Sequence, residues 1–480
     1  MGSTLITLQK YLSAVQAEFA RARLATKPDG VHVLKKDEHI LVDAVESLEL
    51  SGEFRKLADS SDVEFYGGRG KADAPIQMYL RLSRAYQEIF AGEPISAEDI
   101  WSDFSMALSR RERTLTYIAP IAYVNFVSSG PVDCGSFQLR RFSQVELDSL
   151  LRNDVKKVFF PWAYVDTEEV QSFWCASAKQ TMPIDPSVIK LTFDLGFKPT
   201  FSRYPAPVEE VLRQLALYDW DSVSKTKTIA IVEGHAVLAR PYIPFVISVS
   251  DLLTELPDRG PDLTGAENGL SVGPVLFRWA EEGVPFDLDE SRTVQFATRM
   301  GRLSEMTMRA KRFNPGLVET ILGFLLKALT SYGLEELLWH ITAIEAAVGE
   351  EVDGGLTKLL RTRVSRILGR TEGERKAIRR RFSELYDLRS NLVHGNDEIH
   401  DQKVKLTHFL EARRFSRAVV LWTLCYLSHA QHVAESEGEN ALTREDILHV
   451  LDMDERTRPA VTRLLRRTPQ GFPNIDEWLF

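Results

Sequence analysis

The sequence predicts an α+β protein: an N-terminal mixed α/β region followed by a C-terminal all-α helical bundle. Up to about residue 310, the apolar segments are short, β-branched and aromatic, and bounded by Gly, Pro, Asp and Ser, which is typical of strands. Beyond residue 310, longer segments with helical periodicity are joined by short glycine-containing turns, which favours an antiparallel bundle. We therefore divide the chain into residues 1–310 and 311–480, with a subdivision of the first region near residue 130.

In the N-terminal region, the sequence predicts strands within residues 113–127, 156–165 and 227–249. Helices are expected over residues 4–25 and after Ser143, which forms a capping-box pattern with Glu146. A loop rich in Pro, Gly and Asp spans residues 253–269. We find no motif in residues 1–310 that assigns this region a function.

In the C-terminal region, six helices are expected, at residues 315–333, 334–349, 356–369, 374–395, 404–435 and 443–452. Pro315 suits the first turn of a helix, because proline lacks the N–H that the first turn leaves unbonded. Gly333, Gly349 and Gly369 each stand where a helical pattern stops, as glycine commonly does.

The composition indicates a globular protein, with 44% hydrophobic and 26% charged residues among 480. The net charge of -9 gives no global signal for nucleic acid binding. Residues 351–420, however, contain 16 Lys and Arg against 10 Asp and Glu. A local positive charge attracts polyanions, although a solvated helical face explains it equally well.

The three cysteines are odd in number and far apart, which predicts neither a disulfide framework nor a zinc cluster and favours a reducing compartment. The first 25 residues have the pattern of an amphipathic helix rather than of a signal peptide. We find no apolar run of about 18 residues. These observations predict a cytoplasmic protein that makes no use of a membrane.

The stretch "LYDLRSNLVHGND" contains an arginine on what should be the apolar face of a helix. With Leu385 at the centre of that face, Arg389 falls about 40° away, among Ile378, Phe382, Leu388 and Leu392. A guanidinium keeps its charge, and burying it unpaired is very costly. Arg389 therefore needs a partner, a cleft or an interface. Gly395 is a natural helix end, so helical phase does not fix the direction of His394.

Two explanations of Arg389 remain open at this point. It can pair with a carboxylate on a neighbouring helix, for which Glu345 is suitable, while His394 merely favours the negative end of the helix dipole. Alternatively, two copies of the chain can meet along this face and form one site from both. The pattern Arg-x-x-x-x-His is too short to decide, because it also occurs at Arg444 and His449 on a second predicted helix, where we interpret it as chance.

The wider context resembles a known family. The segments "LWHITAIEAAVGEE", "LTKLLRTRVSRILG" and "FSELYDLRSNLVHGND", followed by a long amphipathic helix, are similar to an Apea-like HEPN domain of abortive-infection antiphage proteins over about residues 315–435. The resemblance implies a helical bundle that commonly dimerises. Many HEPN domains are metal-independent endoribonucleases with an Arg-x-x-x-x-His motif from each of two protomers, and others are not catalytic. A common toxin subtype has Tyr where this sequence has Asn396.

The resemblance implies that Arg389 and His394 are catalytic and that Ser390 and Asn391 are supporting polar residues. Histidine transfers protons near neutral pH, and arginine binds the charge that develops on a reacting phosphate. RNA supplies its own 2′-hydroxyl as the nucleophile, so neither a metal nor another cofactor is expected. The neighbouring Arg379, Arg380 and Arg381 would bind the RNA backbone.

The sequence thus predicts a homodimeric, metal-independent endoribonuclease that acts on RNA in antiphage abortive infection. Its N-terminal region would sense a phage-derived trigger. Two alternatives stay open: a catalytically inactive HEPN module that binds RNA or protein, and a toxin controlled by a separate antitoxin.

Other patterns have weaker support. His394, Asp397 and His400 contain metal-binding groups, but their spacing matches no established metal pattern. Ser271 lies in a Gly-x-Ser-x-Gly string without the strand and helix that a nucleophile elbow needs. Residues 66–71, "YGGRGK", fail the phosphate-loop pattern. Aromatic segments around Trp162 and Trp174 suit buried strands better than a stacking surface.

Overall fold

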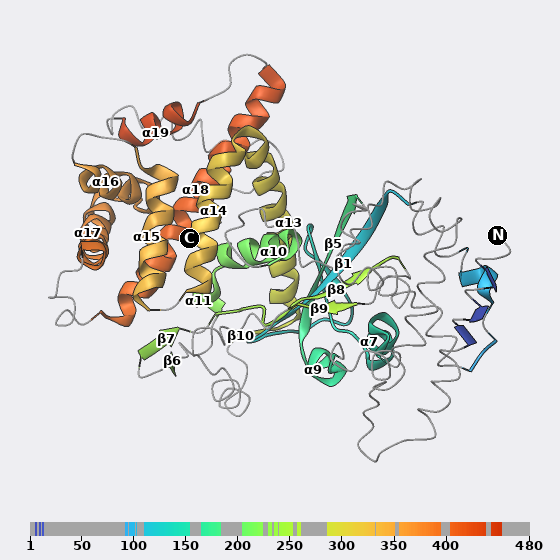
Figure 1. The fold of residues 1–480 in the computed structure, drawn as a ribbon. Helices are drawn as coiled ribbons and strands as arrows, with labels where there is room; N and C mark the ends of the chain where they lie inside the picture. Colours follow the sequence, from blue (N-terminus) through green and yellow to red (C-terminus); the bar gives the residue numbers. More distant parts are fainter. Residues whose placement is uncertain are drawn as a thin grey trace. The chain divides into compact units, whose positions relative to one another are not determined.

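A computed structural model gives the fold as mixed α/β with a helical C-terminal region (Figure 1). It describes scattered residues before 110, and then residues 110–153, 165–183, 204–223, 229–232, 235–238, 240–252, 257–260, 286–331, 333–350, 355–394, 404–437 and 443–453. The chain forms two compact units. Unit 1 contains Met1–Pro120, Arg140–Pro199 and Phe245–Asp262, and unit 2 contains Ile121–Leu139, Thr200–Pro244 and Leu263–Phe480. These units interleave along the sequence, whereas the sequence pattern suggests one main boundary near residue 310.

Unit 1 is built on antiparallel strands. Its strands β1 (Glu112–Ile121), β5 (Trp174–Pro183), β8 (Ile247–Ser250) and β9 (Asp258–Arg259) follow the order β5-β1-β8-β9. Strand β1 pairs antiparallel with β8, and Ile118 lies opposite Ile247. The predicted strands at residues 113–127 and at the end of 227–249 are therefore confirmed, while most of the strand predicted at 156–165 lies outside the described residues.

Two short helices complete the described part of unit 1. Helix α7 (Gln144–Leu151) begins at Ser143 with the predicted capping box, in which the Ser143 N–H donates to Glu146 Oε2 over 2.9 Å. Helix α9 (Thr167–Ser172) is preceded by its N-cap Asp166, whose side chain accepts from backbone N–H groups of the first turn. Apolar side chains of both helices and of the strands form one buried cluster, comprising Ile118, Phe142, Leu147, Leu151, Val165, Val170, Cys175, Phe245 and Ile247.

Unit 2 also contains short strand pairs. Strand β2 (Val124–Phe126) runs parallel to β10 (Phe286–Leu288), although these strands are far apart in the sequence. Strands β3 (Val132–Asp133) and β4 (Gln138–Arg140) pair antiparallel, as do β6 (Ile229–Val232) and β7 (His235–Leu238).

Helices form most of unit 2. Helices α13, α14, α15 and α18 pack against one another, while α16 and α17 pack together beside α15 and α18 (Figure 1). The described helices are α10 (Ala206–Leu217), α11 (Trp220–Val223), α13 (Glu290–Phe313), α14 (Pro315–Thr330), α15 (Leu334–Val348), α16 (Leu356–Leu368), α17 (Glu372–His394), α18 (Leu406–Glu437) and α19 (Arg444–Asp452).

The six helices predicted after residue 310 are confirmed, and their ends differ from the predicted ones by a few residues. Gly333 precedes the first residue of α15, with φ 60, while α14 already ends at Thr330. Helix α13 was not predicted; it begins at Glu290, directly after its N-cap Asp289 and well before residue 310. Its buried residues, such as Phe296 and Met300, recur with helical spacing, but the polar residues between them hide the pattern.

Among the described residues, no helix combines the length and the apolar character needed to cross a membrane. The described cysteines are free. Burial raises the pKa of Cys175 and of Cys425 to about 12, so both are protonated, unreactive thiols at neutral pH.

A buried arginine attaches α19 to the bundle. Arg363 on α16 is 1% exposed and donates from Nε to Asp452 Oδ1 over 3.0 Å and from Nη2 to Asp452 Oδ2 over 2.5 Å. It also donates to Glu350 Oε2 and to the Val348 carbonyl, each over 2.7 Å. Asp452 thus holds the end of α19 through a charged, two-point contact.

Replacing Asp452 with asparagine is expected to lower the free energy of unfolding by about 1–2 kcal/mol, because Arg363 loses a charged partner and keeps Glu350. Hydrogen exchange should speed up in α19 more than in α15. Glu445→Gln, at an exposed first-turn position of the same helix, serves as the control and should change both quantities much less, because it removes only an exposed charge that favours the helix dipole. Unchanged exchange in α19 of the Asp452 variant would show that other contacts hold this helix.

Candidate functional site

Helix α17 positions the predicted catalytic residues. Phe382 and Leu385 are fully buried, so the predicted apolar face is confirmed. Arg389 lies on the flank of this face, half-buried, one turn after Leu385. The helix runs through to His394 as its last residue. The sequence spacing therefore puts Arg389 and His394 on the last two turns of one helix.

Arg389 has a carboxylate partner on the neighbouring helix. Its Nη2 donates to Glu345 Oε2 on α15 over 3.1 Å, and the Tyr386 hydroxyl donates to Glu345 Oε1 over 2.9 Å. The side chains of Arg389 and Glu345 remain 23% and 18% exposed. The ion pair that the sequence allowed as one explanation of Arg389 is thus present, and it lies at the edge of the bundle rather than in its centre.

The tyrosine in this cluster stays a hydrogen-bond donor. Burial, together with the hydrogen bond to Glu345 and its charge, raises the pKa of Tyr386 above its ordinary value. The guanidinium of Arg389 is bonded to Glu345 through one edge, and its buried Nε has no hydrogen-bond partner among the described residues. The arginine is therefore fixed in place while part of its donor set is unused.

The structure describes some of the other residues predicted at the end of α17. Ser390 and Asn391 are half-buried on the turn between Arg389 and His394. Gly395, like Asn396, Asp397 and His400, lies outside the described residues. Within the described part of the chain, no group of three or more His, Cys, Asp or Glu side chains is placed to hold a metal ion.

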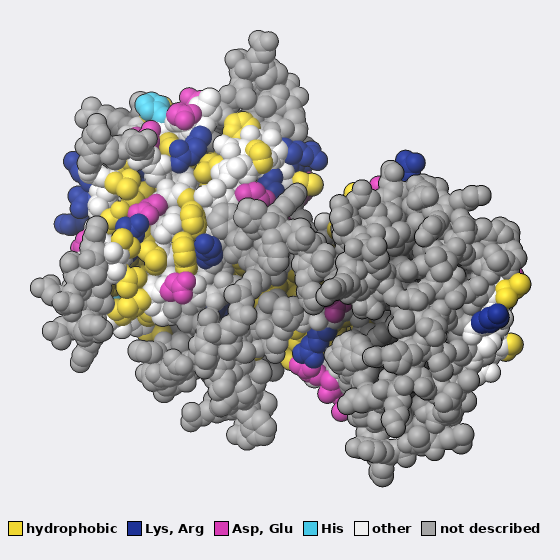
Figure 2. Space-filling view, in the orientation of Figure 1, with side chains coloured by type: hydrophobic (Ala, Val, Ile, Leu, Met, Phe, Trp, Pro, Cys, Tyr) yellow, Lys and Arg dark blue, Asp and Glu magenta, His cyan; other side chains and the backbone are white. Residues whose placement is uncertain are grey.

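The three arginines predicted to bind RNA do not form one free basic face. Arg379 donates to Glu372 over 3.1 Å, and Arg381 lies 3.0 Å from Glu411. Arg380 is 75% exposed, and its Nε lies 3.9 Å from Glu384 Oε1. On the visible, described surface of unit 2, basic and acidic side chains are intermixed (Figure 2). Of these three residues, Arg380 is the most available to a phosphate backbone.

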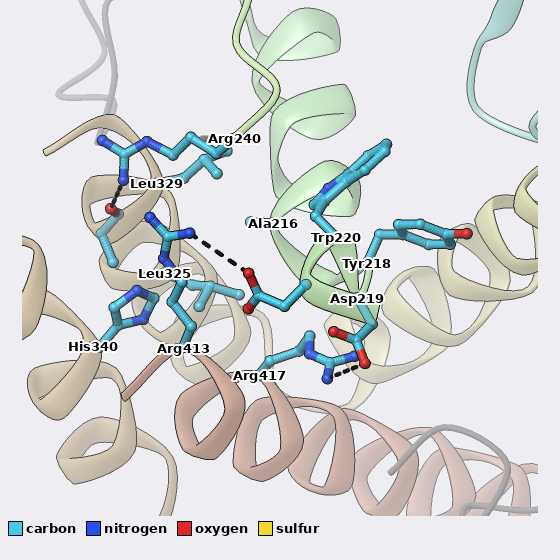
Figure 3. Close-up of a pocket in the computed structure, with 12 residues that line it drawn as sticks. Ala216, Tyr218, Asp219, Trp220, Arg240, Leu325, Leu329, His340, Arg413 and Arg417 are labelled. Atoms are coloured by element: carbon cyan, nitrogen blue, oxygen red, sulfur yellow. Dashed lines mark hydrogen bonds and ion pairs between the residues drawn. The ribbon is translucent and has the colours of Figure 1, made fainter. Parts of the chain in front are cut away.

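A second polar cluster, which the sequence analysis missed, surrounds a cavity of about 50 Å³ inside unit 2. The side chains of Arg240, Arg413 and Arg417 lie around it, with His340 beside them (Figure 3). The cavity is also lined by aromatic and apolar groups, including Tyr218, Trp220, Leu325, Ala328 and Leu329. A space of this size holds a few water molecules.

Glu336 is the central carboxylate of this cluster. It is 2% exposed, accepts from Arg413 Nε over 2.5 Å, and lies 3.4 Å from Arg240 Nη1 and 3.7 Å from His340 Nε2. Burial alone would raise the pKa of Glu336, but the charges of Arg413 and Arg240 and the hydrogen bond with His340 hold it at about 2. Burial lowers the pKa of His340, so the imidazole is neutral at pH 7.

Two further carboxylates balance the remaining charge. Asp219 lies 2.8 Å from Arg417, and Asp221 lies 3.9 Å from Arg413. Burial raises the pKa of Asp221 against the opposing charges of Arg413 and Arg417. Three arginines therefore face three carboxylates, and the network anchors the α11 segment to α18. These residues are distant in sequence, so no local motif signals the cluster.

The same cluster contains a hydroxyl next to a histidine, which does not make a hydrolase site. His340 Nδ1 and Ser416 Oγ are 2.7 Å apart, but Ser416 is completely buried. A substrate cannot reach its oxygen. We interpret this pair as part of the polar core of the bundle.

The structure describes some of the residues that belong to the weaker sequence patterns. Trp174 is buried in β5, with the Arg141 guanidinium 5.4 Å from its ring centroid, so the prediction of a buried strand position is confirmed. Ser271, Trp162 and residues 66–71 lie outside the described residues.

Comparison with known proteins adds no identification: no protein-family model, curated protein or solved structure matches the chain.

Proposed function

We propose that unit 2 is a HEPN-like, metal-independent endoribonuclease that cleaves RNA with Arg389 and His394, the site being shared by two copies of the chain. The observation that supports this most is the placement of the motif on α17. The helix holds a charged, partly exposed arginine at the edge of the bundle and ends at the motif histidine.

The proposed reaction uses the RNA's own 2′-hydroxyl. His394 accepts the proton of that hydroxyl, the oxygen attacks the adjacent phosphorus, and the bond to the 5′-oxygen of the next nucleotide breaks. A proton delivered to the leaving oxygen, by the His394 of the second copy, completes the transfer. Arg389 stabilises the negative charge on the phosphate oxygens during the attack.

The wider role follows from the resemblance to antiphage HEPN proteins. We propose that the protein acts in abortive infection in the cytoplasm, as a homodimer that degrades RNA. The N-terminal region, residues 1–310 in the sequence-based division, would recognise a phage-derived trigger. The support for this role is the arrangement of the chain, in which a large region precedes the helical bundle.

A non-catalytic RNA-binding or protein-interaction module is the second candidate. The ion pair between Arg389 and Glu345 favours this candidate, because it gives Arg389 a structural role that needs no substrate. The ion pairs of Arg379 and Arg381 also reduce the charge available to RNA. This candidate predicts RNA binding without cleavage.

The two candidates differ in one assay. The purified full chain is incubated with mixed cellular RNA in EDTA, beside the variant His394→Ala. We expect the parent to cleave RNA and the variant to be slower by at least about 10²-fold, the usual contribution of a proton-transfer group. Thermal unfolding of both proteins controls for folding, and light scattering reports the dimer. Equal cleavage by parent and variant, or none by either, would reject the nuclease proposal.

A further inference from the structure

Glu345 joins two residues of α17 through the two oxygens of one carboxylate. Oε1 accepts from Tyr386 over 2.9 Å, and Oε2 accepts from Arg389 over 3.1 Å. The two donors are one helical turn apart, and the acceptor belongs to the neighbouring helix α15. The carboxylate is partly exposed, so a ligand that approaches Arg389 from solvent also meets Glu345.

A carboxylate and an RNA phosphate are recognised by arginine in the same way. Both are oxyanions that accept parallel N–H bonds from the guanidinium fork. Glu345 is bonded to Arg389 through Nη2, and the buried Nε of Arg389 is left without a hydrogen-bond partner among the described residues. The guanidinium is thus oriented for an oxyanion but held by a contact that uses only part of its donors.

We propose that Glu345 regulates the affinity of the nuclease site for RNA by occupying the guanidinium of Arg389 in place of the scissile phosphate. This inference rests on the proposed function, because it concerns the same arginine. A phosphate that binds Arg389 must displace Glu345 or lie beside it, and the two negative charges repel each other. Removing the charge of Glu345 therefore strengthens RNA binding.

A structural role for Glu345 makes the opposite prediction. If the carboxylate only neutralises Arg389 and ties α15 to α17, its loss weakens folding and does not strengthen binding of any ligand. A gain in affinity that depends on Arg389 separates the two roles, because no structural defect produces it.

The test uses Glu345→Gln, which keeps the shape of the side chain and removes its charge. Binding of a fluorescently labelled, mixed-sequence single-stranded RNA is measured by anisotropy in EDTA, with His394→Ala in every protein to prevent cleavage. We expect Glu345→Gln to lower Kd by about tenfold, or about 1.4 kcal/mol, and the added change Arg389→Ala to abolish that gain. The control is Asp387→Asn, which removes one exposed carboxylate of α17 and should leave Kd within about twofold.

Cleavage by the proteins with His394 intact is measured in parallel, so that the two proposals can fail separately. If the parent cleaves RNA but Glu345→Gln does not tighten binding, the role of Glu345 is rejected and the nuclease stands. If no protein cleaves RNA but Glu345→Gln still tightens binding through Arg389, the nuclease proposal is rejected. The proposal that Glu345 and the RNA phosphate compete for Arg389 is then supported. If none of the proteins binds RNA, both proposals are rejected.

A folding defect is also informative. Glu345→Ala is prepared alongside, since it removes the charge without adding an amide donor. Circular dichroism checks each variant before binding is measured. If both variants fail to fold, Glu345 is a structural residue and the inference is overturned.

Discussion

Replacing Arg389 with alanine is expected to lower kcat/KM for RNA cleavage by about 10³-fold, as for the loss of one group that stabilises transition-state charge. In a dimer both copies lose the group, so the loss should be at the upper end of this range. Arg389→Lys should recover little, because an ammonium is a point charge that cannot fork onto two phosphate oxygens. The measurement is initial cleavage rate against RNA concentration for the three proteins.

The control for this prediction is Lys376→Ala, at an exposed position on the same helix, which should change kcat/KM by less than about threefold. Removing Arg389 also leaves Glu345 without its ion-pair partner, while the hydrogen bond from Tyr386 to Glu345 remains. Both remain partly accessible to water, so the variant should still fold. Full activity of Arg389→Ala would establish the ion pair with Glu345 as the whole role of this arginine.

Replacing Glu336 with alanine is expected to have the largest effect on stability, a loss of about 3–5 kcal/mol. The change removes the buried carboxylate that Arg240 and Arg413 share, and leaves Arg413 with the longer, 3.9 Å contact to Asp221. Urea unfolding monitored by tryptophan fluorescence should report this loss of stability, because Trp220 lines the cavity beside the charged cluster. Glu384→Gln, an exposed residue with only a loose ion pair, should change the free energy of unfolding by less than about 0.5 kcal/mol.

The same residue predicts a dependence of stability on pH. The pKa of Glu336 in the folded state is about 2, below its ordinary value of 4.5. A lowered pKa stabilises the folded state above about pH 4.5, and this stabilisation disappears as the pH falls towards 2. The raised pKa of Asp221 acts in the opposite direction. The stability of Glu336→Gln should therefore fall less steeply between pH 5 and pH 3 than that of the parent. An unchanged slope would mean that Glu336 does not control acid unfolding.

Much of the local structure was predictable from the sequence, because it depends on residues close together in the chain. The capping box at Ser143 and Glu146, the start of a helix at Pro315 and the end of one at Gly369 all follow from such local chemistry. The apolar face of α17, with Phe382 and Leu385 at its centre, follows from helical periodicity. Helix α13 escaped prediction because most of the residues between its buried positions are polar.

Partners across the fold were less predictable. The sequence required that Arg389 have a counter-charge, a cleft or an interface, since an unpaired buried guanidinium is too costly. Only the packing of α15 beside α17 decided that Glu345 supplies the charge and that Tyr386 shares it. The same holds for Arg379 and Arg381, which the sequence analysis assigns to RNA binding and which the fold pairs with Glu372 and Glu411.

By itself, then, the sequence determined the helices of the C-terminal region, the apolar face of α17 and the position of the motif Arg389 and His394. The tertiary structure alone decided the interleaving of the two units and the cluster of buried charges around Glu336. The reason is physical: helix periodicity and capping act over a few neighbouring residues, whereas a buried charge finds its partner among residues that only packing brings together.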